Sequence, residues 1–283
     1  MHTLGGDDFA FLARLLRRRS GLVLTPDKAG LFERRLGPVM ARFGFKTLTA
    51  LVRQLRLGQE ALAAAVTEAM TVNETFFFRD PEQFAGLRDV VLPRLLAARA
   101  GSKHLRIWSA ASAAGQEIYS LAMLLDEMEL AAKGWNIELI ATDISGEAVA
   151  RAERGHYSVF EVQRGLSLER LSRYFGSEAY GGFIIAERLR RMVTFRRFNL
   201  LDSFGWLDGL DIVLCRNVLI YFDHATRQSV LERCADSMSE DAVLLLGATE
   251  SPQAVTPVFV DMPEAPGFHV RAKPAPSRLG LAI

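Results

Sequence analysis

Hydrophobic residues in the first seventy positions recur at helical spacing. They repeat at intervals of three, four and seven residues, which places them on one face of a helix, and polar residues fill the positions between them. The repeats fall at residues 9–16, 32–43, 48–55 and 62–69. This part of the chain is therefore predicted to form a short all-helical domain.

The pattern changes from about residue 104. Short apolar runs rich in β-formers alternate with longer helical segments, which is typical of a parallel α/β sheet with helices on both faces. Ligands of such sheets bind beyond the carboxyl ends of the strands, so functional residues are expected there. The expected strands are 105–109, 137–142, 211–215 and 242–247, and the expected helices are 116–132, 147–154 and 225–237.

Residues 156–198 interrupt this alternation. A polar, turn-rich run leads through Gly181 and Gly182 to the apolar stretch at 192–195, which predicts a small inserted β-subdomain. The expected organisation is a helical substrate-recognition domain at 1–72, a linker at 73–90, and an α/β domain at 91–283 that carries the insert.

Composition narrows the class of protein. Hydrophobic residues make up 49% of the chain and charged residues 24%, which is a globular balance. The longest apolar runs fall far short of the roughly 18 residues that span a bilayer, and the N-terminus carries acids where a signal peptide carries bases. Only Cys215 and Cys234 occur, too few for a disulfide framework or a zinc cage. We expect a cytoplasmic protein with no membrane insertion and no metal.

The net charge of +1 conceals an asymmetry. Residues 1–56 contain eleven Lys and Arg against four Asp and Glu, a net charge of +7, so the remaining residues carry −6. This division suggests that the N-terminal part faces an anionic partner. The alternative is that Arg17, Arg18 and Arg19 only solvate a helix face.

Two features after the first two strands point to a nucleoside. Seven small residues, 109–115, let the backbone approach a ligand near a helix N-terminus, although tight packing explains them about as well. The run is neither a dinucleotide-binding glycine fingerprint nor a P-loop. Asp143 ends the second strand, where an acid can hold ribose hydroxyls; capping the next helix is the alternative. Together the two features favour a nucleoside site.

Two further stretches combine apolar and polar residues. Arg216 and Asn217 directly follow a buried strand, where packing gives no reason for polar side chains. Phe76, Phe77 and Phe78 stand between polar residues at the junction of the helical and α/β parts. Three consecutive aromatics are more often core than ligand cage, but here they could also exclude water from a cleft.

These motifs together resemble the CheR family of S-adenosylmethionine-dependent protein-glutamate methyltransferases, which modify chemotaxis receptors. The resemblance covers roughly residues 9–270. It rests on five ordered motifs: MTVNETFFFRDPEQF, RIWSAASAAGQEIYSLAM, ATDIS, RRFNLLD and DIVLCRNVLIYFD.

The resemblance implies a Rossmann-like methyltransferase sheet that binds S-adenosylmethionine (SAM) and releases S-adenosylhomocysteine (SAH). For the reaction that this implies, we expect Arg79 and Tyr221 to be the catalytic residues, which orient the incoming carboxylate or the sulfonium. Asp143 would hold the ribose, Asn199 and Leu200 the adenine, and Glu117 the methionyl ammonium. The cofactor-binding residues implied by the resemblance are Asn73, Thr75, Arg79, Glu117, Asp143, Asn199, Leu200, Arg216 and Asn217.

The implied reaction is methyl transfer to glutamates on the helices of methyl-accepting chemotaxis-type receptors, which the basic N-terminal domain would bind. In relatives, a longer loop in the insert binds a receptor's C-terminal peptide. The corresponding loop of this chain is short, so no such tether is expected here. Ala113, Ala114 and Ile118 depart from the family's usual cofactor loop, which leaves a non-catalytic SAM-sensing scaffold as an alternative. A nucleic-acid methyltransferase is less favoured, because no Asn-Pro-Pro-Tyr type motif occurs.

Overall fold

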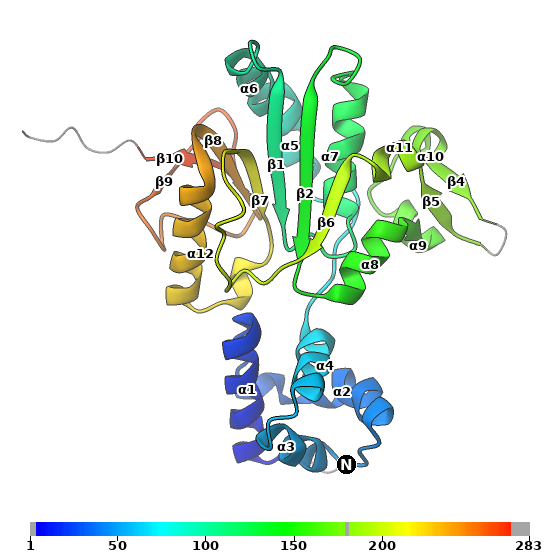
Figure 1. The fold of residues 1–283 in the computed structure, drawn as a ribbon, viewed down its shortest axis with the longest axis vertical. Helices are drawn as coiled ribbons and strands as arrows, with labels where there is room; N and C mark the ends of the chain where they lie inside the picture. Colours follow the sequence, from blue (N-terminus) through cyan, green and yellow to red (C-terminus); the bar gives the residue numbers. More distant parts are fainter. Residues whose placement is uncertain (1–3, 179–180, 273–283) are drawn as a thin grey trace, which may run out of the picture.

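A computed structural model describes residues 4–178 and 181–272. Its N-terminal part is all helical, as predicted, and Figure 1 shows these helices gathered at one end of the molecule. The apolar repeats bring Leu12, Phe32, Leu51 and Leu62 together in a separate core, where each is 0% exposed. The helices are α1 (Gly6–Ser20), α2 (Ala29–Phe43), α3 (Leu48–Arg56) and α4 (Glu60–Met70), with a 3₁₀ turn, η1 (Pro26–Lys28), before α2.

The rest of the chain is built on a seven-stranded sheet. Its strand order is β6-β2-β1-β7-β8-β10-β9, with parallel pairing from β6 to β8 and antiparallel pairing at β10 and β9. This topology confirms the predicted Rossmann-like class. The strands are β1 (His104–Ala110), β2 (Asn136–Asp143), β6 (Val193–Arg197), β7 (Leu210–Cys215), β8 (Met238–Leu246), β9 (Phe259–Asp261) and β10 (Phe268–Arg271).

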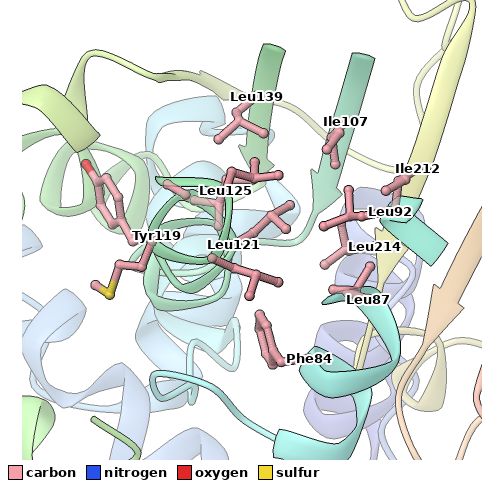
Figure 2. Packing of buried hydrophobic residues seen from close by; sticks show 14 of the residues in the cluster. Phe84, Leu87, Leu92, Ile107, Tyr119, Leu121, Leu125, Leu139, Ile212 and Leu214 are labelled. Atoms are coloured by element: carbon pink, nitrogen blue, oxygen red, sulfur yellow. The ribbon is translucent and has the colours of Figure 1, made fainter. Parts of the chain in front are cut away.

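Helices pack on both faces of this sheet because successive strand residues point to opposite sides. Ile107 belongs to the apolar cluster on one face, and Trp108 to the cluster on the other. Figure 2 shows Leu121 and Leu125 of α7 between the strands and Phe84. The helical segments are α5 (Pro81–Gly86), the π-helical turn η2 (Leu87–Val91), α6 (Leu92–Ala98), α7 (Gln116–Glu127), α8 (Gly146–Arg154), the 3₁₀ turn η3 (Leu219–Tyr221) and α12 (His224–Ser237).

Helix α7 is shorter than predicted. It was expected to run to residue 132, but it ends at Glu127. Glu129 adopts a left-handed conformation with φ 57°, which reverses the chain as residues just beyond helix ends commonly do.

The inserted β-subdomain is confirmed, but the expected end of the insert was wrong. A second sheet has the order β3-β5-β4, yet Val193–Arg197 forms β6, which pairs in parallel with β2 of the main sheet. An alternating pattern identifies a strand without identifying its partner, so both placements fitted the sequence. The elements of the insert are β3 (His156–Tyr157), α9 (Val159–Gln163), α10 (Leu168–Tyr174), β4 (Phe175–Ser177), β5 (Phe183–Ile185) and α11 (Glu187–Arg190).

No described helix has the length and apolar character needed to cross a membrane. Nor do the described parts of the chain bring together three or more His, Cys, Asp or Glu side chains that could hold a metal ion.

Replacing Leu121 with alanine should destabilise the α/β part of the protein. The side chain is 0% exposed, so Leu121→Ala removes buried methyl groups and leaves a cavity, which typically costs about 2–5 kcal/mol of unfolding free energy. Leu57, which is 73% exposed, provides the control, and Leu57→Ala should change that free energy by less than about 0.5 kcal/mol. Urea unfolding measures both, and equal effects would contradict the packing described here.

Candidate functional site

A cleft of about 940 Å³, including its open mouth, lies between the N-terminal helices and the carboxyl ends of the parallel strands. Figure 1 shows the helices facing the ends of β1 and β2. The lining comes from the segments after α1 and α4 and from the loops after β1, β2, β6 and β7. It includes all ten residues expected to bind the cofactor or to act in catalysis: Asn73, Thr75, Arg79, Glu117, Asp143, Asn199, Leu200, Arg216, Asn217 and Tyr221.

The small residues after β1 form a tight loop that is joined to Asp143. Ala111, Ala113 and Gly115 all have positive φ angles, which larger side chains rarely tolerate. The backbone N–H of Ala113 donates to Asp143 Oδ2 at 2.8 Å. Because the backbone makes this contact, alanine at position 113 preserves it.

Asp143 is buried, with 4% of its surface exposed. Burial raises the pKa of its carboxyl group, while hydrogen bonds from the N–H groups of Ser145 and Ala113 act in the opposite direction. The N–H of Ser145 donates to Asp143 Oδ1 at 2.8 Å. The alternative that Asp143 caps α8 is wrong, because Ser145 is the N-cap and accepts the N–H of Ala148.

Ser112 lines the cleft and carries a buried hydroxyl. The residue is 2% exposed, and its Oγ has no hydrogen-bond partner among the described residues. A buried hydroxyl without a partner is costly, so this atom marks an unsatisfied polar group in the loop beside the cleft. Ser112 was not among the predicted site residues, although it lies within the run of small residues.

Arg216 lies at the floor of the cleft, with 1% of its side chain exposed. Its guanidinium donates to Glu117 Oε2, the Arg79 carbonyl and Asp80 Oδ2, each at 2.7 Å, and to Gln83 Oε1 at 2.8 Å. Packing gave no reason for an arginine directly after a buried strand. The ion pairs and hydrogen bonds to these four acceptors supply that reason. Asp80 and Gln83 were overlooked, though both lie in the first of the five motifs and could have been sought as its partners.

Two other predicted residues are also held by the protein. Glu117 accepts the Ser109 hydroxyl at 2.8 Å through its second carboxylate oxygen. The Asn199 side chain donates to the Arg19 carbonyl at 2.7 Å and accepts the N–H of Leu201 at 3.1 Å. Asn199 therefore links the cleft to the end of α1.

Tyr221 lies where the two parts of the molecule meet. Its half-buried ring packs against both the N-terminal core and one of the sheet clusters, and its carbonyl accepts the N–H of Val23 at 2.9 Å. Burial raises the pKa of the phenol, although the nearby cations Arg35 and Arg79 act in the opposite direction. The phenol is therefore neutral, and able to donate a hydrogen bond, at physiological pH.

Arg79 is only lightly held by its neighbours. Its Nη1 donates to the Glu74 carbonyl at 3.4 Å, and its guanidinium carbon lies 5.6 Å from the centre of the Phe76 ring.

The idea that the aromatic triplet excludes water from the cleft was wrong. Phe77 and Phe78 are buried in the core of the α/β part, where their aromatic contacts anchor the linker.

Two more carboxylates at this edge of the sheet were missed. Glu68 of α4 accepts the hydroxyl of Ser145 and the N–H groups of Gly146 and Glu147 at 3.2 and 3.0 Å, at the N-terminus of α8. Glu68 carried no sequence signal, because it occupies an ordinary helical position. Glu250 follows β8 much as Asp143 ends β2, so the same argument could have found it.

Comparison with protein families settles the class of this chain. Residues 73–266 match the family described as CheR methyltransferase, SAM binding domain, and residues 7–71 match CheR methyltransferase, all-alpha domain. The chain belongs to the CheR methyltransferase family. As a CheR-family member it is a SAM-dependent methyltransferase, so the resemblance predicted from the five motifs is confirmed.

Curated CheR-family relatives match almost end to end. Chemotaxis protein methyltransferase 1 of Pseudomonas aeruginosa is 39% identical over 94% of this chain and 98% of its own length. Chemotaxis protein methyltransferase Cher2 of Pseudomonas putida is 36% identical over 95% and 99%. The chemotaxis protein methyltransferase of Vibrio parahaemolyticus is 35% identical over 96% and 98%.

Removing the Arg216 guanidinium should strongly destabilise this CheR-family chain. Arg216→Ala leaves the carboxylates of Glu117 and Asp80 without their buried cation, and breaking such a buried pair typically costs about 3–5 kcal/mol. Urea unfolding measures the loss. Arg88, whose pairing with Asp89 is exposed, provides a control, because Arg88→Ala should leave the unfolding midpoint nearly unchanged. An unchanged midpoint for Arg216→Ala would contradict the structural role assigned to this side chain.

Proposed function

We propose that this enzyme transfers the methyl group of SAM to glutamate side chains of chemoreceptors, and that the two substrates meet in the cleft. The products are a glutamate methyl ester and SAH. One observation carries the proposal: a single cleft collects ten motif residues from segments spread between positions 73 and 221. The relatives are named chemotaxis protein methyltransferases, and this chain matches nearly their full length. Both facts support a chemoreceptor as the substrate.

The residues around the cleft fit SAM. The Asp143 carboxylate keeps acceptor capacity for ribose hydroxyls, because each of its oxygens accepts only one N–H from the loops. The unpaired Ser112 hydroxyl offers a further polar contact, and Glu117 offers negative charge for the methionyl ammonium. Leu200 and Asn199 would meet the adenine. Asn73, Thr75, Arg79, Arg216 and Asn217 complete the proposed cofactor site.

The chemistry needs orientation more than proton transfer. SAM supplies an electrophilic methyl group, and a glutamate with a pKa of about 4.3 is already ionised near neutral pH, so no general base is required. Arg79 would pair with the incoming carboxylate, and the neutral phenol of Tyr221 would donate a hydrogen bond at the reacting centre. Opposite charges disappear as the methyl moves, so a cleft that excludes water favours the transition state. Alignment of the reacting atoms supplies much of the acceleration.

The N-terminal domain would bind the acidic receptor helices. Part of the basic run in α1 serves the protein itself, because Arg17 pairs with Asp223 and Arg19 pairs with Glu60. On α2, by contrast, Arg34 and Arg42 are exposed. These two side chains are the proposed contact with the receptor.

The absence of a receptor tether stays a prediction. The connection between β4 and β5 spans residues 178–182, of which 179 and 180 lie outside the described residues. The prediction rests on the short length of this connection in the sequence.

Asp143→Ala should weaken the binding of both SAM and SAH. Loss of hydrogen bonds between a carboxylate and the ribose lowers affinity at least roughly tenfold, which calorimetric titration measures directly. Asp236→Ala removes an exposed carboxylate on α12 and should bind both ligands as the wild type does. Circular dichroism checks that the Asp143 variant is folded. Wild-type affinity in a folded Asp143→Ala protein would refute the proposed ribose contact.

Methylation of receptors should weaken as salt rises from about 0.05 to 0.5 M, because exposed charges are screened. The expected change is a fall in kcat/KM for the receptor, while the affinity for SAH in the cleft stays nearly constant. The double variant Arg34→Gln, Arg42→Gln should show a smaller salt dependence, and the control Arg88→Gln the full one. Receptor methylation that is constant over this range would show that the N-terminal charges do not guide the substrate.

A further inference from the structure

The loop after β7 carries residues proposed to bind the cofactor and a residue proposed to act at the reacting centre. Arg216 and Asn217 lie on its cofactor side, and Tyr221 ends its 3₁₀ turn. Asn217 has φ 57°, in the left-handed region that asparagine tolerates better than most residues. Here the backbone leaves the sheet, so its N–H groups need partners outside the strand ladder.

Glu250 supplies those partners. The ends of β7 and β8 lie side by side, since Cys215 pairs with Leu246, and Glu250 follows four residues later. Its Oε2 accepts the N–H of Asn217 at 2.7 Å, and its Oε1 accepts the N–H of Ile220 at 3.2 Å. One carboxylate thereby spans the loop from the residue after Arg216 to the residue before Tyr221.

Gly247 makes room for this arrangement. Its own N–H donates to Glu250 Oε2 at 2.9 Å, so the carboxylate is held from both strands. A Cβ at position 247 would lie 2.6 Å from Asn217 Nδ2 and 2.8 Å from Glu250 Oε2, which is too close for either atom. Alanine at this position would therefore push on the Asn217 amide and on the Glu250 carboxylate, disturbing their arrangement without removing either group.

We propose that Glu250 is a positioning residue for methyl transfer, acting through the loop that carries Asn217 and Tyr221. Its carboxylate lies behind the cleft, whose described lining includes Arg216, Asn217 and Tyr221, so it acts without touching substrate or cofactor. This inference rests on the proposed function, because it assigns Asn217 to the cofactor and Tyr221 to the reacting centre. Without the carboxylate, the two N–H groups would seek other partners, and the loop would lose its defined shape.

The test compares Glu250→Gln and Gly247→Ala with the wild type. Glutamine keeps one acceptor oxygen but turns an NH₂ group toward N–H donors, so at least one of the three hydrogen bonds is lost. Folded Glu250→Gln should show an SAH dissociation constant raised at least roughly threefold and a kcat lowered at least roughly tenfold. Gly247→Ala should change both quantities in the same direction, although it keeps the carboxylate. The control is Glu264→Gln, which removes an exposed carboxylate and should match the wild type.

Calorimetry with SAH, methylation kinetics and circular dichroism together decide the outcome. Wild-type kcat and SAH affinity in folded Glu250→Gln would overturn the proposal. So would a fall in kcat that only follows the folded fraction, because that is the result of a purely structural role. If Glu250→Gln does not fold, Gly247→Ala decides by the same criteria. SAH binding requires no receptor, so a wild-type enzyme that fails to methylate receptors would refute the proposed function while the affinities still test Glu250.

Discussion

The buried guanidinium of Arg216 holds the floor of the cleft together. Its four acceptors come from the linker, from α5 and from α7, segments that begin more than ninety positions before it in the chain. Taking a cation out of water is expensive, and only a nearly complete set of charged and polar partners offsets that cost. The linker, the helix after the small-residue loop and the loop after β7 therefore cannot shift independently. The parts of the site keep one fixed arrangement because all of them bind the same guanidinium group.

Several polar contacts attach the N-terminal helices to the α/β part of the protein. Glu68 binds the N-terminus of α8, immediately beyond the Ser145 that supports Asp143, and Asn199 binds the last turn of α1. A carboxylate at a helix N-terminus also meets the positive end of the helix dipole. The segments that follow these helices thus complete the walls of the cleft.

Patterns along the chain predict well whatever depends on local periodicity. The helical domain, the parallel strands and the loops at their carboxyl ends follow from hydrophobic spacing, which is why the ten motif residues could be expected at one edge. The place of β6 could not be predicted, since alternation identifies a strand but the partner strand lies about fifty residues away. The partners of Arg216 and the role of Glu68 were hidden for the same reason. Polar pairing has no period, so it emerges only when the fold brings distant residues together.

The position of Tyr221 has a consequence for how the enzyme fails on heating. Its ring belongs to the apolar core of the helical domain and also to that of the sheet, so it is correctly placed only while the two cores stay joined. Local openings need less free energy than global unfolding, and an interface built on a few polar links is a natural place for one. Catalysis should therefore be lost at temperatures where both cores are still intact. Thermal inactivation in this enzyme would then report the separation of its domains before the melting of either.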